Sequence, residues 1–410
     1  MAKRALSLEV DIPVGDLSAE ILADFKKSFK DDSVTSYRNA KSDEVKTWYS
    51  CGTLGLNIAL GGGLAGGQSS MWYGPKSAGK STTAYAAVAA AQQQFPERIH
   101  IIADAENSAI DAEEHMVKLG VEVDNPNLII IKKPEGKPLY AEDIFERLEV
   151  IFRNPKLKRR LGLVVIDSIG VLVSKHEGEK DNKWEKAARV GGIVSAINMF
   201  IRSVVSSGLL FESDAHLMFL NQIRDNIGDM WNPYRTPGGK MLEHACAQMV
   251  ESSRTMGSDF HNKNYKEGNP LESRFVGQKI KYKVTKNKVG GKEGATANVD
   301  YYYEDGLDLY ADVISLAGHV GLMEGAAWKS LVDPTTGEII ARYQGTEKWK
   351  EALHADDLLW AKLYTMTQMA ARGATSEEIM GAVAELEAGQ PFDDLDKIVG
   401  ETLGDTTETE

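Results

Sequence analysis

The 410-residue sequence has few cysteines and no long apolar run. Its two cysteines, Cys51 and Cys246, are far apart and outside any CxxC pattern, which favours reduced, partly buried thiols over a disulfide. The longest apolar runs, LGLVVID and HLMFLN, fall well short of the roughly 20 residues of a membrane span. The first residues, MAKRALSLEVDIPVG, contain no apolar core of signal-peptide length. We therefore expect a cytoplasmic protein.

The sequence also lacks internal repeats with a period of roughly 20–50 residues, the signature of solenoids and propellers. Its apolar content of 42% and its charged content of 26% are ordinary for a globular protein. The length is sufficient for two or three domains with a sizeable core.

Basic charge is scarce overall but concentrated in one place. Of the net charge of −13, residues 375–410 carry −10, so the remainder of the chain is nearly neutral. Residues 274–292 hold seven Lys or Arg and no acid. Local fields steer phosphates, so this strip is compatible with nucleic-acid binding. Lysines that protect an exposed strand edge from aggregation explain it equally well.

The pattern along the chain predicts four regions. Residues 17–30 predict an amphipathic helix, because Ile21, Leu22, Phe25 and Phe29 fall on one face. One short helix cannot bury its own apolar stripe, so this helix is expected to pack on something else. The regions are an N-terminal helix and linker that would serve as an oligomerisation arm (1–47), an α/β core (48–308), a small α-rich domain (309–388) and an acidic disordered tail (389–410).

Residues of about 50–250 alternate short apolar runs with helical periods. The runs are SSMWY, IHIIAD, NLIIIK, LGLVVID and AHLMFLN. This βαβ pattern predicts an α/β fold with a mostly parallel central sheet covered by helices on both faces. The segments KIKYKVTKN and TANVDYYY alternate with period two around a Gly-rich turn, which predicts a hairpin added to the sheet.

The strongest motif is GPKSAGKS, which fits the phosphate-binding pattern G-x-x-x-x-G-K-[ST]. An apolar strand precedes it and an Ala-rich helix follows, so backbone N–H groups at the helix N-terminus would cradle phosphate oxygens. Lys80 would reach the β- and γ-phosphates of ATP, and the Ser81 hydroxyl would ligate Mg²⁺. The expected nucleotide-binding residues are Gly74, Pro75, Lys76, Ser77, Ala78, Gly79, Lys80, Ser81 and Thr82.

Two further acidic positions complete the expected ATPase site. Asp167 ends the apolar strand VVID, where a carboxylate would meet the phosphates and share Mg²⁺ with Ser81. Glu106, after the strand IIAD, is the candidate base that orients the attacking water, because strand ends converge on the ligand crevice. Asp104, two residues earlier, is an alternative that sequence order does not exclude.

Several motifs, taken in order, resemble the RecA family of homologous-recombination ATPases. GTLGLNIALGGGLAGGQSSMWYGPKSAGKST resembles the family's segment that leads into the P-loop, IIADAEN the segment with the catalytic glutamate, and VVIDSIGVLV the Walker B strand. FLNQIRDNIG followed by PGGK resembles the strand and second DNA-binding loop, and VTKNK the lysine pair that crosses the subunit interface. The likeness covers residues of about 50–320 and is greatest for the phage (UvsX-type) members, which would place the protein in a host cytoplasm.

The resemblance implies roles for the residues around Gln222. Gln222 would sense the γ-phosphate, and the loop that follows would become ordered on DNA. Without the resemblance, a long surface loop with a packed Trp is the simpler interpretation. The expected DNA-binding residues here are Arg224, Asn226, Gly228, Met230, Trp231, Arg235, Gly238, Gly239 and Lys240. A first DNA loop at 174–189 would contribute Lys183, Trp184 and Arg189, although its mixed charges equally suit a solvated loop.

Three more positions follow from the resemblance. Lys286 and Lys288 would reach the γ-phosphate of a neighbouring subunit and stabilise its charge during hydrolysis. Such head-to-tail contacts do not close and therefore build a helical filament. His115 lies where relatives place an aromatic residue that stacks on adenine, although a lone helical histidine is more often a simple surface residue.

The sequence as a whole predicts a Mg²⁺- and ATP-dependent recombinase. It would form filaments on single-stranded DNA, pair that strand with homologous duplex DNA, and work with single-strand-binding and loader proteins. A hexameric helicase core and a non-hydrolysing nucleotide-binding regulator are the alternatives. The lysine pair, in place of an arginine finger, favours the filament over a ring, and the intact Lys80, Ser81, Glu106 and Asp167 favour hydrolysis.

Overall fold

The fold is described from a computed structural model in which residues 14–29, 47–106, 112–175, 192–225, 234–262, 265 and 273–388 are placed. The chain forms two units, Met1–Lys46 and Thr47–Glu410, and each is treated by itself. In the first unit, helix α1 spans Val14–Phe29, close to the helix expected from the sequence. The placed ranges contain no helix that is long and apolar enough to cross a membrane.

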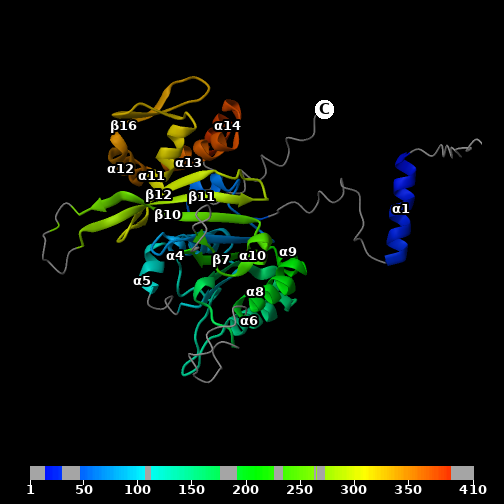
Figure 1. Cartoon of the computed structure of the whole chain (residues 1–410). Coiled ribbons are helices and arrows are strands. Elements are labelled where there is room, and N and C mark those ends of the chain that lie inside the picture. The colour runs from blue at the N-terminus through cyan, green and yellow to red at the C-terminus, as the bar shows by residue number, and fades with distance from the viewer. Residues whose placement is uncertain are drawn as a thin grey trace, which may run out of the picture. The chain divides into compact units, whose positions relative to one another are not determined.

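A nine-stranded sheet forms the centre of the second unit, in the order β13-β12-β11-β10-β3-β7-β6-β4-β5 (Figure 1). The strands from β10 to β5 run parallel, whereas β11, β12 and β13 are antiparallel additions. The mostly parallel sheet is therefore confirmed. The strands are β3 (Ser69–Gly74), β4 (Ile99–Asp104), β5 (Leu128–Ile131), β6 (Leu161–Asp167), β7 (His216–Gln222), β10 (Gln248–His261), β11 (Phe275–Asn287), β12 (Thr296–Tyr302) and β13 (Gly306–Leu307).

The central strands β3, β7, β6 and β4 are buried on both faces because they are apolar at most positions. Successive residues of a strand point to opposite faces. Accordingly, Trp72 and Val165 belong to one core, and their neighbours Met71 and Val164 to another. Helix α4 (Lys80–Gln94) supplies small alanines to the first core. Helices on the other face are α6 (Ala141–Arg153), α8 (Gly192–Phe200), α9 (Leu209–Ser213) and α10 (Gly239–Ala245), with the π-helical η4 (Ile201–Ser206).

The hairpin predicted near the end of the core is confirmed, because β11 and β12 pair antiparallel from Gly277–Tyr302 to Lys283–Thr296. The sequence did not predict β10, which links this hairpin to the sheet. Its residues Gln248–Glu251 pair in parallel with β3, and most of its length pairs with β11.

The C-terminal module has its own core around the buried Trp349. Helices were expected here, and α11 (Leu309–His319), α12 (Gly345–Ala355), α13 (Asp357–Arg372) and α14 (Ser376–Glu387) are present. A three-stranded antiparallel sheet of β14 (Met323–Glu324), β15 (Trp328–Val332) and β16 (Ile339–Gln344) was not expected. The expected acidic tail at 389–410 lies outside the described residues.

Shorter elements complete the core. They are β1 (Trp48–Tyr49), α3 (Leu54–Ala59), β2 (Leu64–Ala65), α5 (Glu113–Lys118), the 3₁₀ turns η2 (Lys158–Arg160) and η3 (Ile169–Val171), β8 (Arg224–Asp225) and β9 (Tyr234–Arg235).

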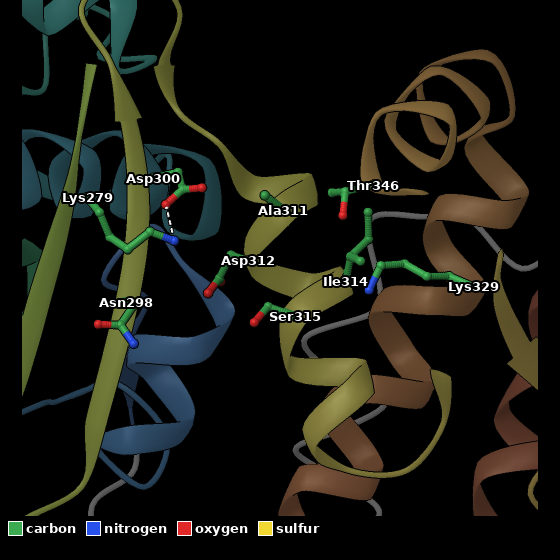
Figure 2. Close-up of a pocket in the computed structure, with 9 residues that line it drawn as sticks. All are labelled: Lys279, Asn298, Asp300, Ala311, Asp312, Ile314, Ser315, Lys329 and Thr346. Atoms are coloured by element: carbon green, nitrogen blue, oxygen red, sulfur yellow. Dashed lines mark ion pairs between the residues drawn. The ribbon is translucent and has the colours of Figure 1, made fainter. Parts of the chain in front are cut away.

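Asp312 joins the C-terminal module to the core. Its carboxylate accepts a hydrogen bond from the backbone N–H of Gly55 at 2.9 Å, in the first turn of α3. Figure 2 shows Asp312 beside a cavity of about 290 Å³ between β12 and the C-terminal module. The pKa of Asp312 is raised to about 6, chiefly by burial. The carboxylates of Asp308 and Asp300 contribute to the increase, and backbone hydrogen bonds from Gly55 and Leu54 oppose it.

The raised pKa of Asp312 predicts a stability that falls with pH. Below a pH of about 4, the Asp312 carboxyl is protonated in both the folded and the unfolded protein. Between pH about 4 and about 6, it loses its proton only in the unfolded chain. The group therefore lowers the free energy of unfolding by ~3 kcal/mol as the pH rises through this window. In denaturant unfolding, Asp312→Asn should remove that fall, whereas Asp305→Asn, at an exposed site, should keep it. Equal slopes for wild type and Asp312→Asn between pH 4 and 7 would contradict this.

Candidate active site

The loop GPKSAGKS connects β3 to α4. Gly79 precedes the helix with φ of 78°, a left-handed conformation that favours glycine, and a Cβ there would lie 2.4 Å from the Ile280 side chain. Ser77 also has a positive φ of 60°. Pro75, Lys76 and Ser77 are exposed at the tip, whereas Gly74 and Ala78 are buried at its two sides. The loop is thus held open at the N-terminus of α4, as phosphate binding requires.

Lys80 lies inside this loop, with only 9% of its surface exposed. Its Nζ donates hydrogen bonds to the carbonyl oxygens of Gly74 at 3.1 Å and Pro75 at 2.7 Å. Burial lowers the pKa of Lys80, and the carboxylates of Asp167 and Glu106 partly restore it. The ammonium group therefore lies inside the loop, where the phosphate oxygens of a nucleotide would bind.

Ser81 and Asp167 form the second half of the phosphate site. The Ser81 hydroxyl donates to Asp167 Oδ2 at 2.8 Å, which joins the first turn of α4 to the end of β6. Burial raises the pKa of Asp167 to about 6. The Ser81 hydrogen bond counteracts that increase, and the charge of Glu106 adds to it.

The pair Ser81–Asp167 fits a magnesium ion. A hydroxyl and a carboxylate are the hard oxygen ligands that Mg²⁺ prefers, with phosphate and water at its other positions. Within the placed ranges there is no group of three or more His, Cys, Asp or Glu that would form a complete protein cage for a metal. The donor set therefore suits an ion that is bound jointly with a nucleotide.

The strand order brings the remaining acids to the same edge. β7 lies between β3 and β6, and β4 follows β6, so the carboxyl ends of four strands meet there. Asp104 pairs in register with Asp167 and is 2% exposed. Glu106, two residues past the end of β4, is exposed to solvent. Between the two candidate bases, Glu106 is therefore the one within reach of solvent.

Two side chains hold the Glu106 carboxylate. The Gln222 amide donates to Glu106 Oε1 at 3.1 Å, and the Ser168 hydroxyl donates to the same oxygen at 2.7 Å. Gln222 is also the register partner of Gly74, at the start of the phosphate loop. The sequence placed Gln222 near a phosphate, but nothing in it indicated the contact with Glu106 or the part of Ser168.

The DNA loop expected after Gln222 is tied at its base. β8 and β9 form a two-residue antiparallel ribbon in which Arg224 lies opposite Arg235. Arg224 also donates to the carbonyl oxygen of Gly170 at 2.8 Å. Gly238 and Gly239, with φ of 100° and 78°, begin α10, and Lys240 is exposed in its first turn.

Several expected DNA-binding residues lie outside the described ranges. They are Asn226, Gly228, Met230 and Trp231 of the second loop, and Lys183, Trp184 and Arg189 of the first loop.

His115 lies close to the first turn of α4. Its Nε2 is 3.4 Å from the Thr82 hydroxyl, and its Nδ1 is 3.2 Å from the Tyr301 hydroxyl. The rings of Tyr85 and Tyr301 contact it edge-on. Burial lowers its pKa, so the ring is neutral at pH 7. A neutral ring beside the P-loop helix can face a nucleobase.

Lys286 lies near the end of β11, and Lys288 follows that strand. Lys286 Nζ donates to the carbonyl oxygens of Glu243 at 2.5 Å and His244 at 3.3 Å, in the last turn of α10. Burial lowers its pKa, and the charge of Lys288 lowers it further. Lys288 is exposed. Within one chain, Lys286 therefore contacts the helix that follows the DNA loop. Among the residues that the structure describes, neither ammonium group bonds to the same subunit's phosphate loop.

The strand–loop–helix unit at residues 69–94, with its buried lysine and adjacent serine–aspartate pair, defines a P-loop protein of the α/β class. A family model described as the RecA N-terminal domain matches residues 17–308. The RecA protein of Bacillus licheniformis is 32% identical over 335 residues, which cover 81% of this chain and 85% of that protein. The RecA protein of Halalkalibacterium halodurans is 31% identical over 337 residues, with the same shares. The chain therefore belongs to the RecA family and is a RecA-type ATPase.

A solved structure of the RadB recombinase aligns with 63% of this chain and 98% of its own length, at 17% identity and a TM-score of 0.43.

Proposed function

We propose that this protein is an ATP-dependent DNA recombinase of the phage (UvsX) type. It forms helical filaments on single-stranded DNA and catalyses homologous pairing and strand exchange in recombination, repair and recombination-dependent replication. The observation that carries the proposal is the 3.1 Å hydrogen bond from Gln222 to Glu106. The residue at the root of the DNA loop thereby contacts the carboxylate best placed to activate water.

The ATPase chemistry follows from the side chains at the sheet edge. The phosphate loop and Lys80 bind the phosphates of ATP, and Glu106 orients and deprotonates the attacking water. Mg²⁺, held by Ser81 and Asp167, would neutralise charge on the phosphates. His115 would face the adenine from the side of Thr82. These groups come from the start of α4, the ends of β4 and β6, and helix α5, and they would converge on one nucleotide.

DNA binding would depend on the loop that begins at Arg224. When Gln222 turns from Glu106 towards a γ-phosphate, the ribbon that closes the loop moves with it. Met230 and Trp231 would then wedge between or stack on bases, and Arg224, Arg235 and Lys240 would contact phosphates.

The basic strip gains a defined geometry in the structure. Lys281 and Lys283 are exposed on the same face of β11, two positions apart, which is ~6.8 Å along a strand. Lys279, next in the row, forms an ion pair with Asp300 at 2.8 Å. Exposed ammonium groups at this spacing suit the phosphates of a second DNA strand better than the protection of an edge, because β11 pairs with β10 and β12 and has no free edge.

Filament formation would bring Lys286 and Lys288 to the ATP of a neighbouring subunit. Their charges would stabilise the phosphoryl transition state as an arginine finger does. Helix α1, with Ile21 and Phe25 exposed, is the proposed oligomerisation arm. Two unburied apolar side chains on one face are what a packing partner would cover.

A strand-exchange assay with and without ATP tests the nucleotide, DNA and assembly claims together. Exchange of a homologous strand is expected only with ATP, and single-stranded DNA should raise the ATPase rate by roughly tenfold or more, within the usual range of coupling between sites. Electron microscopy should show open helical filaments. Closed rings with unwinding activity would indicate a helicase core, and ATP binding without hydrolysis would indicate a regulator.

A further inference from the structure

Ser168 has no role in the function proposed above, and its surroundings suggest one. It follows Asp167 at the end of β6 and precedes the turn η3. Its side chain is 1% exposed, and its hydroxyl donates to Glu106 Oε1 at 2.7 Å. We propose that Ser168 is a positioning residue for ATP hydrolysis, which fixes the Glu106 carboxylate in the orientation that activates water. This inference rests on the proposed role of Glu106.

Glu106 needs such a partner because its own strand does not fix it. β4 ends at Asp104, so Glu106 lies two residues beyond the last ladder position. Its backbone N–H forms a long hydrogen bond of 3.3 Å to the carbonyl oxygen of Asp167, and its side chain is exposed. An exposed glutamate side chain populates several rotamers. Fixing it in one rotamer costs conformational entropy, which a favourable contact must offset. The Ser168 hydroxyl provides that contact from a neighbouring strand.

The turn that carries Ser168 is itself rigid. Ile169 and Leu172, which are 1% and 9% exposed, anchor the turn in the core beneath it. The Ser168 hydroxyl is therefore preorganised, so its hydrogen bond to the Glu106 carboxylate costs little further conformational entropy.

Gln222 and Ser168 donate to the same oxygen, Glu106 Oε1, but Gln222 has a second proposed partner. Gln222 is partly exposed at the root of the DNA loop, and its proposed task takes its amide to the γ-phosphate. Ser168 lies buried just after β6, with no such second task. When Gln222 turns away, Ser168 is the donor that stays on Glu106 Oε1, so the base keeps its orientation during hydrolysis.

A substitution series tests this role through the ATPase rate. Ser168→Ala should lower kcat by ~10- to 100-fold, the usual cost of losing a group that orients a reactive one, because the carboxylate samples unproductive orientations. The KM for ATP should change less than about twofold, because the Ser168 hydroxyl bonds to Glu106 and not to the phosphate loop. Ser168→Thr, which retains the hydroxyl, should recover most of the rate. Ser213→Ala, at another buried serine, should leave kcat unchanged.

A double-mutant cycle separates positioning from general support of the fold. In a Glu106→Gln background, Ser168→Ala should cause less than about a twofold further loss in single-turnover hydrolysis, since the group it orients is gone. Equal losses in both backgrounds would overturn the proposal, as would a kcat for Ser168→Ala within twofold of wild type. All these rates are measured without DNA, so a failed strand-exchange assay would refute the recombinase function and leave this result unaffected.

Discussion

Lys80→Ala is expected to lower kcat for ATP hydrolysis by at least ~10²-fold, the typical loss on removing one preorganised charge from the transition state. Lys80 is the buried cation of the phosphate loop, and its Nζ bonds to the Gly74 and Pro75 carbonyls show that the loop already encloses an ammonium group. Alanine leaves the phosphates without this charge. A phosphate-release assay with saturating single-stranded DNA measures the loss.

The control is Lys133→Ala, which removes an exposed lysine after β5 and should keep the full rate. Thermal unfolding of both variants distinguishes a catalytic loss from a folding defect, because only two carbonyl contacts disappear with the Lys80 side chain. If Lys80→Ala hydrolyses ATP within threefold of wild type, then GPKSAGKS is only a Gly-rich turn between a strand and a helix.

Glu106→Gln is expected to lower kcat by ~10²–10⁴-fold, the contribution typical of a general base. The amide keeps the shape of the side chain and can still accept the Ser168 hydrogen bond, but it cannot take a proton from water. Binding of ATP and of single-stranded DNA should persist, since Glu106 touches neither the phosphate loop nor the DNA loop beyond Gln222. Rapid-quench hydrolysis and fluorescent-nucleotide binding measure the two properties separately.

Asp104→Asn and Glu135→Gln complete the comparison. Glu135→Gln changes an exposed glutamate in the segment after β5 and should be neutral. Asp104 is 2% exposed beside Asp167, so its substitution should act mainly on stability. A full rate for Glu106→Gln together with a large loss for Asp104→Asn would identify Asp104 as the base instead.

The features that the sequence predicted are local ones. A strand, a glycine-containing loop and a helix are contiguous at residues 69–94, so the phosphate loop could be recognised from the amino-acid sequence of this segment alone. The paired strands β11 and β12 alternate with period two around a short turn, and they too were predicted.

The features that the sequence did not predict depend on strand order or lack a pattern. The contact between Gln222 and Glu106 exists only because β7 and β4 flank β6, which no spacing reveals. Strand β10, QMVESSRTMGSDFH, mixes polar residues on both faces and shows no alternation. Ser168 is a small residue without a motif of its own, and its importance emerges only from the 2.7 Å bond to Glu106.

The place of β7, immediately between β3 and β6, has a thermodynamic consequence. Nucleotide and DNA would act on adjacent strands separated by about 4.8 Å, so a shift caused by one ligand reaches the site of the other without an intermediate element. Linkage then requires reciprocity: the factor by which ATP tightens the protein's hold on a DNA strand must equal the factor by which that strand tightens its hold on ATP.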